Sequence, residues 1–381
     1  MLLLAENSME YFPLEIARLK NLADFSWRGN RCITPVEVLD GRYAQITNSP
    51  NVAGAAKTVE YFGRCLAALE THKLNLDHFD LCTFPNDVVK FELLTELSVH
   101  DNMLQIVPAS IAGMLSLRVL ALHGNRISAV PASTGKLTNL EVLNLASNLL
   151  QFLPAEIGLC KNLVQLSLQD NPLIGPLQDL INRGTPDVLA YLNMLFEAQR
   201  TKELNLSFQG FRFFPVEAMY IDDLKTLFVN DNQIRVIPES VGPIMTALTV
   251  LNLSNNELAT LPYTVGEMTA LRKLSLSGNV LKNLPPTMGR ITSLKELTVT
   301  NNLLEAPPAD VVERGGAAIL SYLRSFHVGN RTGILTIRYS IYLLYRYIST
   351  NTDTEGAVQS DESREAAAGD GCQGTQFSWL Y

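Results

Sequence analysis

The chain has 381 residues, of which 30 are basic and 38 are acidic, and its formal net charge is −8. Neither sign gathers into a long block, which argues against a nucleic-acid-binding protein because such a protein needs a basic face. The five cysteines are scattered and contain no C-x-x-C pair, so their spacing fits a reducing cytosol better than a disulfide framework or a zinc site.

The first residues, MLLLAENSMEYFP, hold only a short apolar run with no basic residue before it, whereas a secretory signal needs both a positive region and a longer apolar core. The segment ILTIRYSIYLLYRYI at 334–348 is too short and, with Arg338 and Arg346, too charged to span a bilayer. We therefore expect a cytoplasmic protein without a membrane span.

A regular repeat occupies much of the chain. The segment LRVLALHGNRISAVPASTGKLTN at 117–139 is followed directly by LEVLNLASNLLQFLPAEIGLCKN at 140–162. Both fit the pattern LxxLxLxxNxLxxLPxxIxxLxx, and this pattern with a period of 23 residues is typical of leucine-rich repeats. The pattern predicts strand motifs that begin near Leu22, Thr71, Leu94, Leu117, Leu140, Leu163, Thr201, Leu224, Leu248, Leu271 and Leu294.

The residue pattern of one repeat predicts its local structure. The alternation LxLxx predicts a short strand with its leucines on one side, and the asparagine that follows can bond the backbone of the turn and of its neighbours. The later Leu-Pro step makes the return segment irregular or only briefly helical. Because no repeat buries its leucines alone, the sequence predicts an α/β solenoid: a right-handed leucine-rich-repeat horseshoe with a parallel concave sheet, interrupted by helical joints.

Two segments interrupt this period and resemble each other. YFGRCLAALETHKLNLDHFDLCTFP at 61–85 and YLNMLFEAQRTKELNLSFQGFRFFP at 191–215 share Tyr, Thr, LNL and the final Phe-Pro at an offset of 130. The apolar spacing in PDVLAYLNMLFEAQR predicts a helix that covers the end of the preceding repeats; a helix that docks a partner is the alternative. YLRSFHVGNRTGILTI at 322–337 opens a third joint.

These observations divide the chain into four parts. Residues 1–60 hold partial leading repeats with an inserted exposed loop at 41–54, and 61–190 form the first leucine-rich-repeat block. Residues 191–337 form the second block and the start of a third joint, and 338–381 are a divergent tail whose polar composition predicts disorder. Neither end shows a capping module, so we expect a part of a longer array or a gene model cut at both ends.

The LPxxI step in 23-residue units, together with the block endings LINRGTPDVLAYL and VERGGAAILSYL, resembles the intracellular Ras-group leucine-rich repeat proteins. The resemblance covers residues 2–337. It implies a cytosolic adaptor that holds signalling proteins, such as a small GTPase or a phosphatase, and it carries over no particular binding residue. The inserted loop and the tail depart from that family.

The chain contains none of the motifs GxxxxGK[ST], HExxH or GxSxG. We therefore expect no catalytic residue and no cofactor, and we place function on strand residues that point out of the concave face. The candidate partner-binding residues are Asp77, His78, His100, Asp101, His123, Asn144, Gln169, Phe208, Phe228, Asn230 and Asn252.

Three of the five histidines fall in three consecutive predicted strands. Since adjacent strands lie about 4.8 Å apart, Asp77, His100 and His123 should form one column, with His78 and Asp101 beside it. Two imidazoles and a carboxylate could bind Zn²⁺, and the imidazoles could make partner binding pH-sensitive. We favour a solvated polar face without a metal.

Phe208 and Phe228 are aromatic residues at outward positions of successive predicted strands, where they would be interface anchors or be partly covered by the joint helix. We interpret the chain as a non-enzymatic scaffold or adaptor in intracellular signalling. The alternative is the sensor or targeting portion of a larger signalling enzyme, a kinase or GTPase, whose catalytic domain lies outside this chain.

Overall fold

The computed structural model describes residues 2–3, 7–8, 13–22, 25–26 and 52–332. Two compact units divide the chain, Met1–His327 and Val328–Tyr381, and the second is described only as far as residue 332. The tail at 338–381, residues 41–51 of the inserted loop, and Leu335 and Ile337 of the third joint lie outside the described residues. The loop prediction was wrong for residues 52–54, which begin the helix α2, Val52–Thr71.

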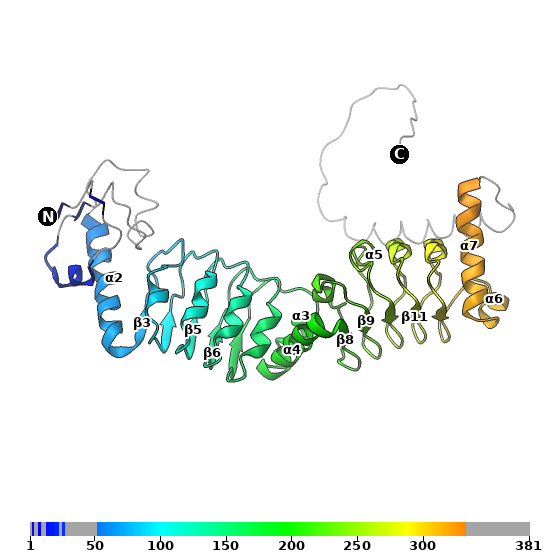
Figure 1. The fold of residues 1–381 in the computed structure, drawn as a ribbon, viewed down its shortest axis with the longest axis horizontal. Helices are drawn as coiled ribbons and strands as arrows, with labels where there is room; N and C mark the ends of the chain where they lie inside the picture. Colours follow the sequence, from blue (N-terminus) through cyan, green and yellow to red (C-terminus); the bar gives the residue numbers. More distant parts are fainter. Residues whose placement is uncertain (1, 4–6, 9–12, 23–24, 27–51, 333–381) are drawn as a thin grey trace, which may run out of the picture. The chain divides into compact units, whose positions relative to one another are not determined.

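Two parallel five-stranded sheets carry the repeats (Figure 1). Each strand begins two residues after its predicted motif start. The first sheet has the order β3 (Lys73–Asn75), β4 (Glu96–Ser98), β5 (Val119–Ala121), β6 (Val142–Asn144) and β7 (Gln165–Ser167). The second runs in sequence order through β8 (Glu203–Asn205), β9 (Thr226–Phe228), β10 (Val250–Asn252), β11 (Lys273–Ser275) and β12 (Glu296–Thr298). A separate parallel pair joins β1 (Leu2–Leu3) to β2 (Phe25–Ser26).

The leucine at the middle of each three-residue strand forms the core. In both sheets these leucines are at most 8% exposed, and each pairs with the leucine of the next repeat, as Leu97 does with Leu120. The residues on either side of the central leucine remain half-buried or exposed. One face of each five-stranded sheet is therefore apolar and buried, and the other is available to solvent, as the LxL alternation predicts.

The turn asparagines form the predicted hydrogen-bond ladder. Asn125, for example, donates from Nδ2 to the carbonyl oxygens of Val99 at 3.0 Å and Leu122 at 2.9 Å, and its Oδ1 accepts from the backbone N–H of Leu104 at 3.0 Å. Equivalent bonds are made by Asn102, Asn148, Asn171, Asn232, Asn256, Asn279 and Asn302. Each amide thus ties its own turn to the preceding repeat, which satisfies backbone groups that burial would otherwise leave unpaired.

The return segments are short helices, as the Leu-Pro step predicts. Most are 3₁₀ helices that begin directly after a proline: η1 (Leu14–Arg18), η3 (Ala109–Gly113), η4 (Ala132–Lys136), η5 (Ala155–Leu159), η6 (Val216–Tyr220), η7 (Tyr263–Glu267) and η8 (Pro286–Arg290). The others are η2 (Val88–Lys90), α3 (Leu177–Leu180), α5 (Val241–Ile244) and α6 (Ala309–Glu313).

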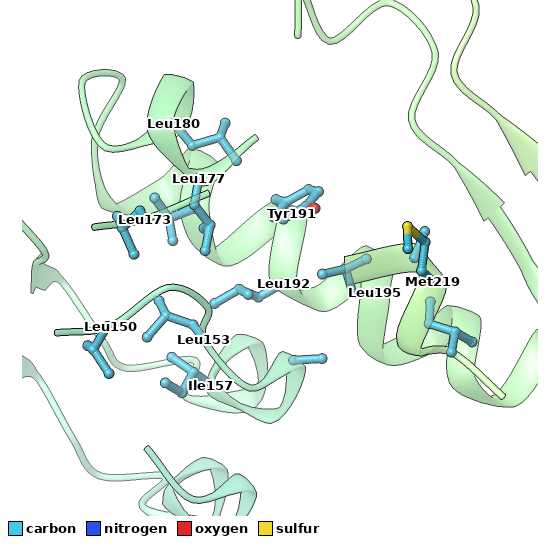
Figure 2. Packing of buried hydrophobic residues seen from close by; sticks show 14 of the residues in the cluster. Leu150, Leu153, Ile157, Leu173, Leu177, Leu180, Tyr191, Leu192, Leu195 and Met219 are labelled. Carbon is cyan, nitrogen blue, oxygen red and sulfur yellow. The ribbon is translucent and has the colours of Figure 1, made fainter. Parts of the chain in front are cut away.

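Long helices stand at the predicted joints: α2, α4 (Thr185–Thr201) and α7 (Gly316–Thr332). Helix α4 packs on η5 so closely that a Cβ on Gly158 would lie 2.6 Å from the backbone nitrogen of Asn193. A Cβ on Gly289 of η8 would likewise lie 2.7 Å from the carbonyl oxygen of Leu323 on α7. Figure 2 shows Leu192 and Leu195 of α4 within one buried cluster, which confirms a helix that covers the preceding repeat.

Polar side chains also connect the end of the first block and helix α4 to the first repeat of the second block. The buried Asp179 accepts from Nε of Arg212 at 2.7 Å and from its backbone N–H at 3.0 Å. Arg183 donates to the carbonyl oxygen of Gln209 at 2.7 Å. The hydroxyl of Tyr191 donates to Oε2 of Glu217 at 2.8 Å. These contacts replace the asparagine ladder where the joint helix interrupts it.

Candidate functional site

The strand face is the solvent-facing side of the two sheets, formed by the first and third residues of each strand and the segment directly after it. Three predicted partner-binding residues, Asn144, Phe228 and Asn252, are the third residues of β6, β9 and β10. The other eight lie in the segments that follow a strand: Asp77, His78, His100, Asp101, His123, Gln169, Phe208 and Asn230. Asp77 is buried, while His78, Asp101, Gln169 and Phe208 are exposed and the rest are half-buried.

In the first block, five of these residues form one cluster. The imidazole of His100 lies between two carboxylates, with Nε2 at 2.9 Å from Oδ2 of Asp77 and Nδ1 at 2.9 Å from Oδ2 of Asp101. His123 stacks on His100 with ring centroids 4.2 Å apart, and His78 meets His100 edge to face at 5.2 Å. The structure therefore places Asp77, His100 and His123 in one column, with His78 and Asp101 next to His100.

His123 is half-buried at the end of the stacked imidazoles. Its Nδ1 is buried and has no hydrogen-bond partner. Desolvation, and then the neighbouring His100, lower the pKa of His123, although Asp101 and Asp77 act in the opposite direction.

The second block carries a different network at the corresponding positions. At an offset of 130, Asn230 replaces His100, and its Oδ1 accepts from Ser207 Oγ at 2.8 Å and from Asn252 Nδ2 at 3.0 Å. Asn230 Nδ2 donates to Oδ2 of Asp231, the counterpart of Asp101, at 2.6 Å. The two blocks thus share a polar network of similar layout, with imidazoles only in the first.

Ion pairs join exposed charged residues of neighbouring repeats, in or directly before their strands. Lys73 contacts Glu96 at 2.6 Å, Arg118 contacts Glu141 at 3.0 Å, and Lys273 contacts Glu296 at 2.9 Å. These groups are exposed, so each pair stabilises the fold by less than about 1 kcal/mol.

A turn position with left-handed backbone follows every strand. In eight repeats it holds a small or short polar residue: Asp101, Gly124, Ser147, Asp170, Asp231, Asn255, Gly278 and Asn301. The first repeat of each block departs from this rule, with His78 at φ 61° and Phe208 at φ 60°. Bulky side chains rarely adopt this conformation, because Cβ approaches the backbone. Two aromatic residues are therefore held in strained turns at matching places.

Phe208 is also 75% exposed, so the joint helix does not cover it. Phe228 is half-buried, and in the β-sheet register it lies between Asn205 of β8 and Asn252 of β10. The backbone N–H of Phe208 donates to the carbonyl oxygen of Asn230 at 3.1 Å. Phe208 is thus the more accessible of the two predicted aromatic anchors.

A family model described as leucine rich repeat matches residues 116–173 and 222–281. The fold is a leucine-rich-repeat solenoid. No curated protein sequence matches the chain significantly. Among the described residues, no helix combines the length and the apolar character needed to cross a bilayer.

Three solved structures are similar to the solenoid. A leucine-rich repeat protein of Leptospira interrogans is 25% identical, with 81% of this chain and 80% of that chain covered and a TM-score of 0.30. The plant peptide hormone receptor RGFR1 in complex with RGF2 is 20% identical, with 77% and 38% covered and a TM-score of 0.27. The complex PEPR1–AtPEP1 is 21% identical, with 61% and 38% covered and a TM-score of 0.28. This chain spans 38% of each of these last two chains.

Sequence reasoning missed one feature of the solenoid, the pairing of a joint tyrosine with an acid 26 residues later. Tyr191 bonds Glu217, and at an offset of 130 the corresponding residues are Tyr61 and Asp87. Burial raises the pKa of Asp87. The sequence did contain a signal for this pairing. Acidic residues occur at both 87 and 217, and they have the same offset of 130 as the two joint tyrosines.

Proposed function

We propose that this solenoid is a non-enzymatic scaffold that binds a protein partner through the strand face of its second block. The coarse function, protein–protein interaction, is general for the leucine-rich repeats that the family model matches. The further steps, to a cytoplasmic signalling adaptor and to a small GTPase or phosphatase as partner, draw on the resemblance of the LPxxI repeats and block endings to Ras-group proteins.

Phe208 is the observation that carries the proposal. Because its side chain is 75% exposed, Phe208 contributes little hydrophobic stabilisation to the fold. Its left-handed backbone, at φ 60°, adds strain. Folding therefore gains little from this side chain. Aromatic anchors dominate the energetics of many protein interfaces, so a partner that covers the ring would recover the free energy that folding leaves unused.

The polar surroundings of Phe208 suit an interface rim. Asn230, Asn252 and Asp231 beside it form a connected hydrogen-bond network with ordered side-chain directions. Pre-ordered polar groups bind at a lower entropic cost than mobile ones. We place the centre of the interface at Phe208 and the half-buried Phe228, with the asparagines around them.

The substitution Phe208→Asn tests this function. Asparagine tolerates left-handed backbone, as Asn255 does in the same column, so the variant keeps the turn and removes the ring. The control is Ile106→Asn, which removes another exposed apolar side chain, 69% exposed, from the first block. Partners are captured from cytoplasmic extract by the full chain and then titrated as purified proteins.

We expect Phe208→Asn to weaken partner affinity by about 30-fold, the loss of a hot-spot residue, and Ile106→Asn to leave the affinity unchanged. An affinity unchanged by Phe208→Asn would exclude the second-block strand face as the partner site. Loss of affinity in both variants would indicate a general dependence on surface hydrophobicity and would also contradict the proposal.

A further inference from the structure

The position of His100 between two carboxylates leaves one of its two contacts without a hydrogen to share. A neutral imidazole carries one N–H and one lone pair, so it can donate to only one of its acidic neighbours. Both Asp77 and Asp101 lie at 2.9 Å from a ring nitrogen of His100. Unless a proton or a metal ion lies on the second side, a lone pair and a carboxylate oxygen face each other within hydrogen-bond distance.

Asp77 determines which ring nitrogen carries the hydrogen. This carboxylate is 8% exposed, and its Oδ1 accepts from Ser98 Oγ at 2.5 Å and from the backbone N–H of His100 at 2.9 Å. Its Oδ2 is left for Nε2 of His100. A buried carboxylate that accepts the outer N–H of an imidazole is the usual support of a metal-binding histidine. This arrangement directs the Nδ1 lone pair toward Asp101.

His78 supplies a third donor at the same place. Its Nε2 lies 3.8 Å from Oδ2 of Asp101, and one donor atom each from His78, His100 and Asp101 lie within 4.8 Å of one another. Donors on a tetrahedral zinc ion lie about 3.4 Å apart, given bonds of about 2.1 Å. The distances of 2.9 Å and 3.8 Å to Asp101 fall on either side of that value.

We propose that His78, His100 and Asp101 bind a zinc ion, with Asp77 as a positioning residue behind His100. Two imidazoles and one carboxylate match the donors that Zn²⁺ takes in proteins. Three protein donors leave a fourth coordination position open, for water or for a donor from a bound molecule. The ion would neutralise Asp101 and join the turns after β3 and β4.

Two further observations agree with this assignment. His78 occupies a left-handed turn position, φ 61°, where its block otherwise uses Asp, Gly or Ser, so the turn itself does not require an imidazole. The second block has the same layout but replaces His78 and His100 by Phe208 and Asn230. It lacks both imidazoles and therefore serves as an internal comparison for the first block.

The test is zinc titration of the full chain without a polyhistidine tag, by isothermal calorimetry, together with the visible absorption spectrum of bound Co²⁺. The substitutions His78→Asn and His100→Asn remove one donor each, and asparagine is the residue that the second block has in place of His100. Asp77→Asn tests the positioning role. His72→Asn is the control, because it removes a histidine of the same block from another left-handed position, φ 55°. Circular dichroism verifies the fold of every variant.

We expect one zinc ion per chain, a tetrahedral Co²⁺ spectrum, and an affinity at least about tenfold weaker in His78→Asn, His100→Asn and Asp77→Asn, with His72→Asn unchanged. Absence of saturable binding, with His100 carrying hydrogens on both ring nitrogens in an NMR spectrum, would show that a proton is the cation and would overturn the proposal. Binding of equal strength in His78→Asn would overturn the donor set.

Discussion

The hydroxyl of Tyr191 on α4 donates a hydrogen bond of 2.8 Å to Oε2 of Glu217 on η6. Both side chains are buried, and the other carboxyl oxygen of Glu217 has no hydrogen-bond partner. Gly175, at φ 63°, makes room for the carboxyl group, because a Cβ there would lie 3.0 Å from Oε2. Burial raises the pKa of Glu217 to about 7, against the smaller opposite effect of its hydrogen bonds.

This pKa predicts a pH-dependent stability. The folded chain holds a proton on Glu217 up to pH about 7, whereas the unfolded chain releases it near the ordinary value of 4.5. The contribution is fully present below pH 4.5 and is lost as the pH rises through about 7, a loss of about 3 kcal/mol in the free energy of unfolding. Urea unfolding at several pH values should show this decline in the wild type and a flatter profile in Glu217→Gln. Parallel profiles would contradict the assignment.

A comparison of the two joints predicts that lengthening the acid of the first joint raises the stability of the fold and that shortening the acid of the second joint lowers it. Tyr61 and Asp87 occupy the places of Tyr191 and Glu217, but the Tyr61 hydroxyl interacts with the Cys65 thiol and makes no hydrogen bond to Asp87, whose buried Oδ1 has no hydrogen-bond partner. Asp87→Glu extends the acid toward Tyr61 and should stabilise the chain by about 1 kcal/mol. Glu217→Asp should destabilise it, because it withdraws the acceptor from Tyr191. Chemical denaturation of both variants checks the signs, and two changes of equal sign would refute the comparison.

The asparagine ladder predicts a graded loss of stability. Asn125→Ala leaves the buried backbone N–H of Leu104 without an acceptor, whereas the carbonyl oxygens of Val99 and Leu122 keep the side-chain amides of Asn102 and Asn148 as donors, and should cost about 2 kcal/mol. Asn302→Ala removes the same kinds of bond, but the residue is half-buried and water can replace them, so we expect about 1 kcal/mol. Asn139→Ala, which breaks one exposed bond to Leu115, is the matched control. Equal losses at 125 and 302 would show that burial does not determine the cost.

The aromatic turns predict substitutions that raise stability. Phe208→Asn and His78→Asn relieve left-handed strain and should each stabilise the metal-free chain by about 0.5–1 kcal/mol. Phe228→Ala should do the reverse, because Phe228 is half-buried on β9 at an ordinary strand position. Thermal unfolding in the presence of a chelator separates these effects from any bound metal. A destabilised Phe208→Asn would mean that the ring packs on the fold.

The sequence predicts the repeat structure well because its causes are local and periodic. The leucines of the LxL motif must be buried, and the turn backbone must find hydrogen bonds, so Leu97 and Asn125 have the predicted positions in the structure. The same reasoning places the joint helices, since the apolar spacing around Leu192 and Leu195 is that of a helix.

Side-chain directions in the turns were beyond this reasoning. Strand spacing groups Asp77, His100 and His123 with His78 and Asp101 beside them, but it does not predict that the imidazole of His100 lies between the carboxylates of Asp77 and Asp101. The start of α2 at Val52 was also missed, because GRYAQITNSPNVAG reads as a loop by its composition. No local pattern links Tyr191 to an acid that lies in another repeat.

The interruption of the asparagine ladder at α4 has a consequence for cooperativity. Within each block, neighbouring repeats share buried amide bonds that salt does not screen. Asp179–Arg212 connects the two blocks, and Tyr191–Glu217 joins helix α4 to the second block, through groups that respond to ionic strength or proton concentration. Amide hydrogen exchange should therefore reveal two separately opening segments whose boundary lies at the joint. Ionic strength and pH then change how strongly the unfolding of one block is coupled to the unfolding of the other, while the cooperativity within each block is unchanged.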